Sequence, residues 1–222
     1  MKRILFLTII CSSFLIQFAG AQVTYGIRAG ANFSKWEGED LQIIEDLVDK
    51  TDGWLETKGK TGFHVGGYVN IPISRRFSFE PGLAYSKKGY SLMGDFQIDA
   101  IKVLGINAGA RVQQHYIDIP LYLRAGITKG LNIYAGPQVS VLARSTLNAK
   151  LGVLGISIFN KGIDITNRFN RVDLGLSGGL GYQFDNGLNL QAGYDYGLSK
   201  LDKNANYAAY NRVIKVSVGY TF

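Results

Sequence analysis

The chain of 222 residues contains few of the residues that crosslink a fold, ligate metals or interrupt strands. Its one cysteine, Cys11, excludes a disulfide within the chain. Two histidines, His64 and His115, limit imidazole catalysis and metal ligation to those positions. Only four prolines occur, and proline interrupts β-ladders because it has no backbone donor. We expect no metal and no cofactor, and long uninterrupted strands are possible.

Beyond the first 21 residues there is no apolar run of the roughly 20 residues that a membrane helix needs. The opening has two basic residues, an apolar segment from Ile4 to about Phe18, and the small residues Ala19, Gly20 and Ala21. This layout predicts a secretory signal over 1–21, which would remove Cys11 on cleavage, and a single domain over 22–222.

The net charge of +7 comes from scattered lysines and arginines. Neither a basic helix nor an aromatic RNA-binding signature accompanies them. We therefore expect no nucleic acid among the partners.

The chain ends in an alternating pattern, RVIKVSVGYTF. Every second residue is apolar: Ile214, Val216, Val218, Tyr220 and Phe222. Period two predicts a strand with one apolar and one polar face. An open sheet would leave this last strand as an exposed edge, which invites aggregation. The pattern therefore predicts that another strand pairs with it.

The same alternation recurs along the mature chain. It predicts eight strands, near 23–36, 60–73, 76–90, 113–127, 131–144, 171–184, 188–200 and 212–222. The tight connections SRR, TKG and DNG alternate with four longer ones. Short turns at one end and long loops at the other are typical of outer-membrane barrels.

The predicted strands are long enough to cross a bilayer, which takes about 9 to 11 residues. Because hydrocarbon cannot satisfy an open sheet edge, a spanning sheet must close. We therefore predict an all-β fold, an eight-stranded antiparallel transmembrane up-and-down β-barrel whose last strand pairs with the first. Its termini and short turns would be periplasmic, and its long loops extracellular.

Charged residues within the strands share the polar face. A Lys or Arg that faces lipid costs about 2 to 4 kcal/mol at the midplane, so this face must point inward. The predicted lumen charge network consists of Arg28, Glu80, Asp118, Arg124, Asp173, Asp195 and Lys215. Two interpretations remain open: a paired plug that fixes strand register, or a gated polar path for small solutes.

Aromatic residues cluster near the predicted strand ends. Those expected in the interfacial girdles are Phe33, Trp36, Tyr85, Tyr182, Phe184, Tyr194 and Tyr196. A soluble sandwich or lipocalin-like barrel is the alternative, but it would bury the apolar face and expose the charged one.

The first long connection, residues 37–58, is acidic and has Leu41, Ile44, Leu47 and Val48 at helical spacing. It is consistent either with a short amphipathic helix over the barrel mouth or with a solvated loop.

A lipid-modifying enzyme would need a serine beside a histidine that a third polar group orients. No serine motif singles out a partner for His64 or His115, and both are expected to be solvated rim residues. By its place in the alternating pattern, His64 belongs to the face that points into the lumen. His115 belongs to the face that points toward lipid.

Several stretches resemble the porin-like outer-membrane β-barrel family found widely in Bacteroidota. They are FSFEPGLAYSKKGY, HYIDIPLYLRAG, IYAGPQVSVLAR, DLGLSGGLGYQF, AGYDYGLSKL and RVIKVSVGYTF. The resemblance implies insertion in the outer membrane, with Tyr220 and Phe222 in the signal that the barrel-assembly machinery reads. It brings no catalytic motif, and one similar branch serves in secretion and gliding.

The sequence therefore predicts a monomeric, non-enzymatic outer-membrane protein with a largely filled lumen and a structural or surface-interaction role. A passive small-solute porin is the first alternative, and a lipid-modifying enzyme the second. The expected partners are outer-membrane lipids and lipopolysaccharide, together with the assembly machinery during insertion. The sequence names no surface ligand and no secretion partner.

Overall fold

The computed structural model describes residues 22–38, 55–95, 106–153, 156–203 and 208–222. The described part has nine strands and one short 3-10 helix. They are β1 (Thr24–Glu37), β2 (Leu55–Pro72), β3 (Phe77–Asp95), β4 (Ile106–Gly126), β5 (Leu131–Val153), β6 (Ile156–Asp164), η3 (Thr166–Arg168), β7 (Val172–Gln183), β8 (Leu188–Gly197) and β9 (Tyr210–Thr221). The predicted signal segment and the predicted helix of the first loop lie outside the described residues.

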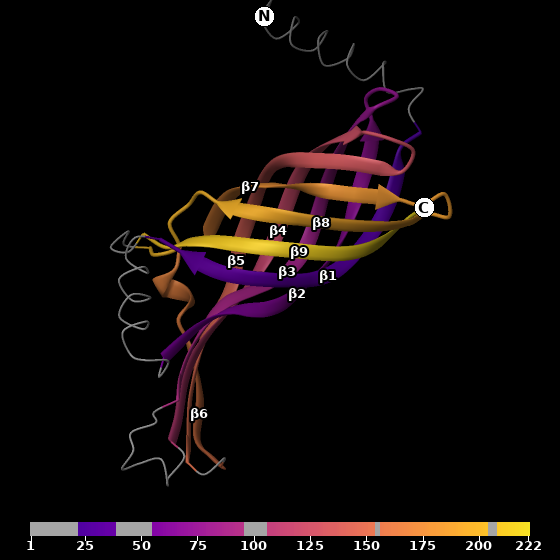
Figure 1. Cartoon of the computed structure of the whole chain (residues 1–222). Helices are drawn as coiled ribbons and strands as arrows, with labels where there is room; N and C mark the ends of the chain where they lie inside the picture. Colours follow the sequence, from indigo (N-terminus) through magenta and orange to yellow (C-terminus); the bar gives the residue numbers. More distant parts are fainter. Residues whose placement is uncertain (1–21, 39–54, 96–105, 154–155, 204–207) are drawn as a thin grey trace, which may run out of the picture.

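Eight of these strands close into an antiparallel barrel (Figure 1). The hydrogen-bonded order runs β4-β3-β2-β1-β9-β8-β7-β5, and β5 returns to β4. At the seam β1 pairs with β9 from Gly26↔Thr221 to Glu37↔Tyr210. The prediction that the last strand pairs with the first is confirmed, and each of the eight described barrel strands has a neighbour on both sides.

Tight turns join strands at the end where the chain terminates. Gly130 and Gly187, the glycines of TKG and DNG, have φ of 87° and 89°. This left-handed backbone favours glycine in such hairpins. Phe222 extends the closed ladder by one further bond, from its N–H to the carbonyl of Tyr25 at 2.8 Å.

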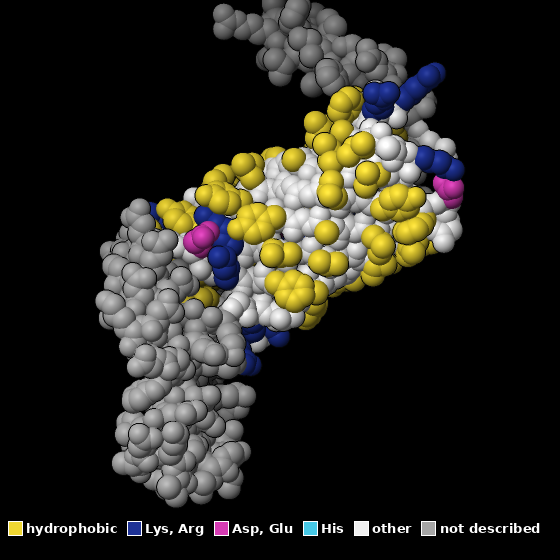
Figure 2. Space-filling view, viewed as in Figure 1, with side chains coloured by type: hydrophobic (Ala, Val, Ile, Leu, Met, Phe, Trp, Pro, Cys, Tyr) yellow, Lys and Arg dark blue, Asp and Glu magenta, His cyan; other side chains and the backbone are white. Residues whose placement is uncertain are grey.

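The barrel has its apolar side chains outside (Figure 2). Large exposed apolar residues occur on every barrel strand, for example Ile27, Val65, Leu83, Leu123, Ile133, Leu176, Leu190 and Val216. Soluble monomers rarely expose apolar patches beyond a few hundred Å². Polar side chains, in contrast, fill the interior. The alternative of a soluble barrel is therefore wrong. No helix in the described part is long and apolar enough to cross a membrane.

One predicted long loop is instead a strand extension. The sequence analysis ended the fifth strand at residue 144, whereas β5 continues to Val153, and a further strand, β6, begins at Ile156. Among the described strands, β6 pairs only with the second half of β5, from Thr146↔Asp164 to Val153↔Ile156. The physical reason is that alternation continues through Leu147, Ala149, Leu151 and Val153. Outer parts of β3 to β6 thus project beyond the barrel, at the end far from the C-terminus (Figure 1).

Candidate functional site in the barrel lumen

The lumen contains two groups of paired charges, and the first lies nearer the short turns. Glu80 of β3 is only 3% exposed. It accepts from Arg28 of β1 at 3.1 Å and pairs with Arg124 of β4, whose Nε lies 2.6 Å from Oε2. Arg124 also donates to Asn132 Oδ1 at 2.6 Å, and the Arg28 guanidinium lies 4.2 Å from the centre of the Tyr68 ring.

The second group lies deeper and joins four strands. Asp118 of β4 is 1% exposed and accepts from Lys88 of β3 at 2.9 Å. Its other oxygen lies 3.5 Å from Nζ of Lys215 on β9. Lys215 pairs more closely with Asp195 of β8, at 2.6 Å. Two cations and two anions therefore neutralise one another inside the barrel, as buried charges require.

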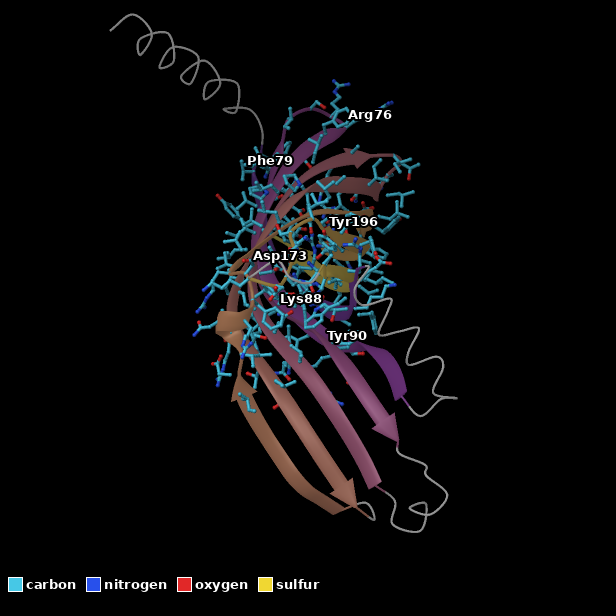
Figure 3. All side chains as sticks on the ribbon, turned by 90° about the vertical axis from the view of Figure 1, so that its left-hand side faces the viewer. Arg76, Phe79, Lys88, Tyr90, Asp173 and Tyr196 are labelled. Atoms are coloured by element: carbon cyan, nitrogen blue, oxygen red, sulfur yellow. The ribbon has the colours of Figure 1, made fainter. Side chains whose placement is uncertain are left out.

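Lys88 is the lumen charge that the sequence analysis missed. It is 2% exposed, and Figure 3 shows it inside the barrel with Asp173. The parity signal was present, because Ser86 and Lys88 continue the inward series of Glu80 and Ala84. The position was overlooked because it lies near the predicted strand end.

Asp173 lies in the lumen but outside both charge groups. Among the described residues it has no cationic ion-pair partner, and its Oδ2 accepts from Asn211 Nδ2 at 2.7 Å. Its Oδ1 is buried without a hydrogen-bond partner. Its described hydrogen-bond partner is thus the amide of Asn211, and not a cation as predicted. No group of three or more His, Cys, Asp or Glu in the described part could hold a metal ion.

Among the cavities lined by described residues, the lumen is hollow only at the end with the short turns. There a cavity of about 480 Å³ is lined by residues that include Arg28, Glu80, Arg124 and Arg76. Beyond it, the space beside His64 and Lys215 measures about 50 Å³. Further out, the space beside Lys88 and Asp173 is about 10 Å³.

Aromatic rings lie together at the end of the barrel opposite the short turns. Trp36 of β1 stacks on Tyr90 of β3 with ring centres 5.3 Å apart, and it also contacts Phe169. Figure 3 shows Tyr90 toward the end opposite Arg76. Trp36 was predicted in the outer girdle, and this was wrong. Trp36 lies between Lys35 and Glu37 at a position of β1 that points into the barrel. Its ring therefore occupies the barrel opening and does not face lipid.

The other predicted girdle residues have outward parity at the two ends of the barrel. Tyr182 contacts Phe184 near the short turns, with ring centres 4.7 Å apart, and Tyr220 likewise contacts Phe222. At the other end are Phe33, Tyr85, Tyr194 and Tyr196. Tyr85 packs on Phe63 and hydrogen-bonds His115.

His64 is buried in the lumen, which corrects the expectation of a solvated rim histidine. Its Nδ1 lies 2.7 Å from Asn32 Oδ1, and its Nε2 lies 3.1 Å from Ser217 Oγ. The Asn32 amide donates to Ser86 and to backbone carbonyls, which directs its oxygen toward His64. This is a serine–histidine–amide relay, and sequence reasoning missed it because the three residues come from three strands.

The relay has little space for a substrate. The neighbouring cavity of about 50 Å³ is far below the roughly 300 to 1,000 Å³ of ligand pockets. Acyl transfer also requires free donors for an oxyanion. Ser217 pairs with Gly30 on one side and with Gln191 on the other, so the local backbone is engaged in ladders.

Comparison with protein families decides the classification. The family model described as outer membrane protein beta-barrel domain matches residues 17–203. The chain belongs to this family. It is therefore a bacterial outer-membrane β-barrel protein, in contact with membrane lipid through the apolar exterior described above.

Solved structures with a similar chain path share little sequence with this outer-membrane barrel. Ail of Yersinia pestis, in complex with the heparin analogue sucrose octasulfate, is 16% identical with a TM-score of 0.45, and the match covers 90% of this chain and 99% of Ail. Neisserial surface protein A is 13% identical with a TM-score of 0.42, covering 89% and 97%. A major outer membrane protein of Thermus thermophilus is 11% identical with a TM-score of 0.47, covering 90% and 99%. No curated protein matches the chain.

Proposed function

We propose that this barrel is a monomeric, non-enzymatic outer-membrane protein with a sealed lumen and a structural or surface-interaction role. The observation that carries the proposal is the decrease in cavity volume from about 480 to 50 to 10 Å³ along the described lumen. Charge pairs and stacked rings occupy the remaining space. The sheet that projects beyond the barrel supports surface interaction, because it offers protein surface beyond the membrane.

The proposed orientation has both termini and the short turns in the periplasm. Its support is the asymmetry of the barrel, since the projecting β5–β6 extension is at the end opposite the C-terminus (Figure 1). Tyr220 and Phe222 are 45% and 68% exposed at the end of β9. They are therefore accessible to the assembly machinery that we propose reads this strand.

The porin alternative makes a different prediction in planar bilayers. With the lumen sealed, the refolded protein is expected to give no large, steady conductance level. Single-channel recording measures this directly, and the Arg28→Ala variant serves as the comparison. Steady openings in the wild type, with an ion preference that shifts in Arg28→Ala, would contradict the sealed lumen and establish a pore.

The enzyme alternative depends on Ser217 and His64. Because so little space adjoins them, we expect a fluorophosphonate probe to leave Ser217 unlabelled. We also expect the lipid A acyl pattern to be the same in cells that express the wild type or Ser217→Ala. Mass spectrometry measures both. Labelling that disappears in Ser217→Ala and in His64→Gln would establish a nucleophile and overturn the proposal.

A further inference from the structure

Basic residues form a cluster on the outside of the barrel, immediately past the apolar belt. On β2 to β5, the last outward apolar or aromatic residues are Phe63, Tyr85, Ile117 and Val141. We take these residues as the limit of the membrane-spanning segments. Farther from the short turns than these four residues lie five basic side chains, here called the rim cluster. They are Lys60, Lys87, Arg111, His115 and Arg144.

Strand register brings three of these side chains into one row. Lys87 of β3 is paired directly with His115 of β4, and His115 is paired with Arg144 of β5. Side chains directly opposite each other in adjacent strands have Cβ atoms about 4.5 to 5.5 Å apart, and like charges in that position are destabilising. Lys60 of β2 joins the row, since its Nζ donates to Gln113 Oε1 at 3.1 Å.

Among the described residues, the rim cluster has little counter-charge. Within the described part of the chain, only Arg144 has a carboxylate partner, Asp164 at 3.6 Å, and both side chains are more than half exposed. Burial, and then the charges of Lys87 and Arg111, lower the pKa of Lys60 to about 8. Burial, followed by Lys87, Lys60 and Arg144, also lowers the pKa of His115. The cationic side chains therefore repel one another, and an anion would relieve this repulsion.

We propose that the rim cluster binds the phosphate of a phosphorylated glycolipid of the lipid A type in the outer leaflet. The side chains face sideways from the barrel wall, just past its apolar belt, which is the level of lipid headgroups. Lysine and arginine supply the charge-assisted donors that phosphate accepts. A soluble anion would not require the cluster to adjoin the apolar belt. The assignment to the outer leaflet rests on the proposed orientation.

The test compares two variants of equal charge change. The first is Lys60→Gln/Lys87→Gln/Arg111→Gln, which neutralises the three cations that have no carboxylate partner among the described residues. The control is Arg75→Gln/Arg76→Gln/Lys129→Gln, which removes three exposed cations near the short turns. Each full-length protein is refolded into phosphatidylcholine nanodiscs, and binding of bisphosphorylated lipid A is titrated by native mass spectrometry.

We expect the rim variant to bind lipid A about 100-fold more weakly, the loss expected for three basic residues near an anionic surface. The control variant and the wild type are expected to bind equally. The altered gel mobility of unheated folded barrels confirms that each variant is folded. Equal binding by the rim variant, or equal binding of dephosphorylated lipid A by the wild type, would refute the site.

Inorganic phosphate distinguishes the two sources of the anion. If it displaces lipid A at millimolar concentration, the cluster is a site for soluble anions and the glycolipid assignment is wrong. Nanodiscs present both leaflets to lipid A, so this result does not depend on orientation. The conductance and labelling experiments test the lumen separately, so failure of the proposed function remains distinguishable.

Discussion

Replacing Asp118 with alanine is expected to lower the free energy of unfolding by about 3 to 5 kcal/mol, the range for breaking a buried ion pair. The carboxylate is almost fully buried between Lys88 at 2.9 Å and Lys215 at 3.5 Å. Lys215 keeps Asp195 as a partner. Lys88, with 2% of its side chain exposed, keeps the Ser140 hydroxyl at 3.3 Å and the Tyr116 ring at 4.9 Å, but no carboxylate within ion-pair distance among the described residues. The cost is therefore that of an uncompensated cation.

Urea unfolding in phosphatidylcholine vesicles, followed by tryptophan fluorescence, measures this loss. Asp185→Ala is the matched control, because Asp185 pairs with Lys129 at 3.0 Å while both side chains are more than 80% exposed. Such a surface pair contributes less than about 1 kcal/mol. The double variant Asp118→Leu/Lys88→Met should recover most of the loss, since it removes the stranded charge. Equal stabilities of Asp118→Ala and Asp185→Ala would contradict the buried network.

Gly30→Val is expected to prevent closure of the barrel, with a cost of roughly 3 kcal/mol or more from overpacking. A Cβ at Gly30 would lie 2.1 Å from the carbonyl oxygen of Val216 and 2.7 Å from Cε1 of His64. Val216 belongs to β9, so the clash falls at the seam where the last strand meets the first. Backbone atoms on this seam cannot move away without breaking the ladder.

Gly67→Val is the matched control on the next strand. A Cβ at Gly67 would have only the Gly26 carbonyl oxygen nearby, at 3.6 Å, and the position is exposed on the exterior. We expect this variant to fold like the wild type. The folded, fast-migrating band on unheated gels measures the outcome for both. Comparable folding of Gly30→Val and Gly67→Val would show that the inward position is not crowded.

Parity explains why so much of the barrel could be predicted. In β9 the alternation of Ile214, Val216 and Val218 with Lys215 and Ser217 sets the face of each side chain locally. The glycines of TKG and DNG likewise identified two hairpins. Such signals lie within a few residues of one another, so no knowledge of the fold is needed to interpret them.

Several errors arose where a strand meets the aqueous phase. Lys88 and Trp36 both continue the alternation that points side chains into the lumen, and both lie near predicted strand ends. At a strand end, polar and aromatic residues are expected both at the lipid interface and inside the barrel opening, so the sequence pattern does not distinguish the two. The β5–β6 extension alternates like the barrel strands, yet residues beyond 144 were assigned to a loop. Hydrophobic alternation does not mark where the membrane ends.

Which polar and charged side chains contact one another could be determined only from the closed barrel. Arg28 and Arg124 share Glu80 from three strands, and His64 lies between Asn32 and Ser217 from two others. Such contacts depend on the stagger between strands and on the narrow circumference of eight strands. Neither can be deduced from alternation within one strand.

The amino-acid sequence by itself determined that eight strands alternate, which faces meet lipid, and that the two end strands must pair, because each follows from local periodicity and from the absence of water in hydrocarbon. Only the tertiary structure decided which charges neutralise one another, how far the lumen is filled, and that Lys87, His115 and Arg144 form one row on the outside. Those properties depend on register between strands, which is set by the packing of the whole barrel.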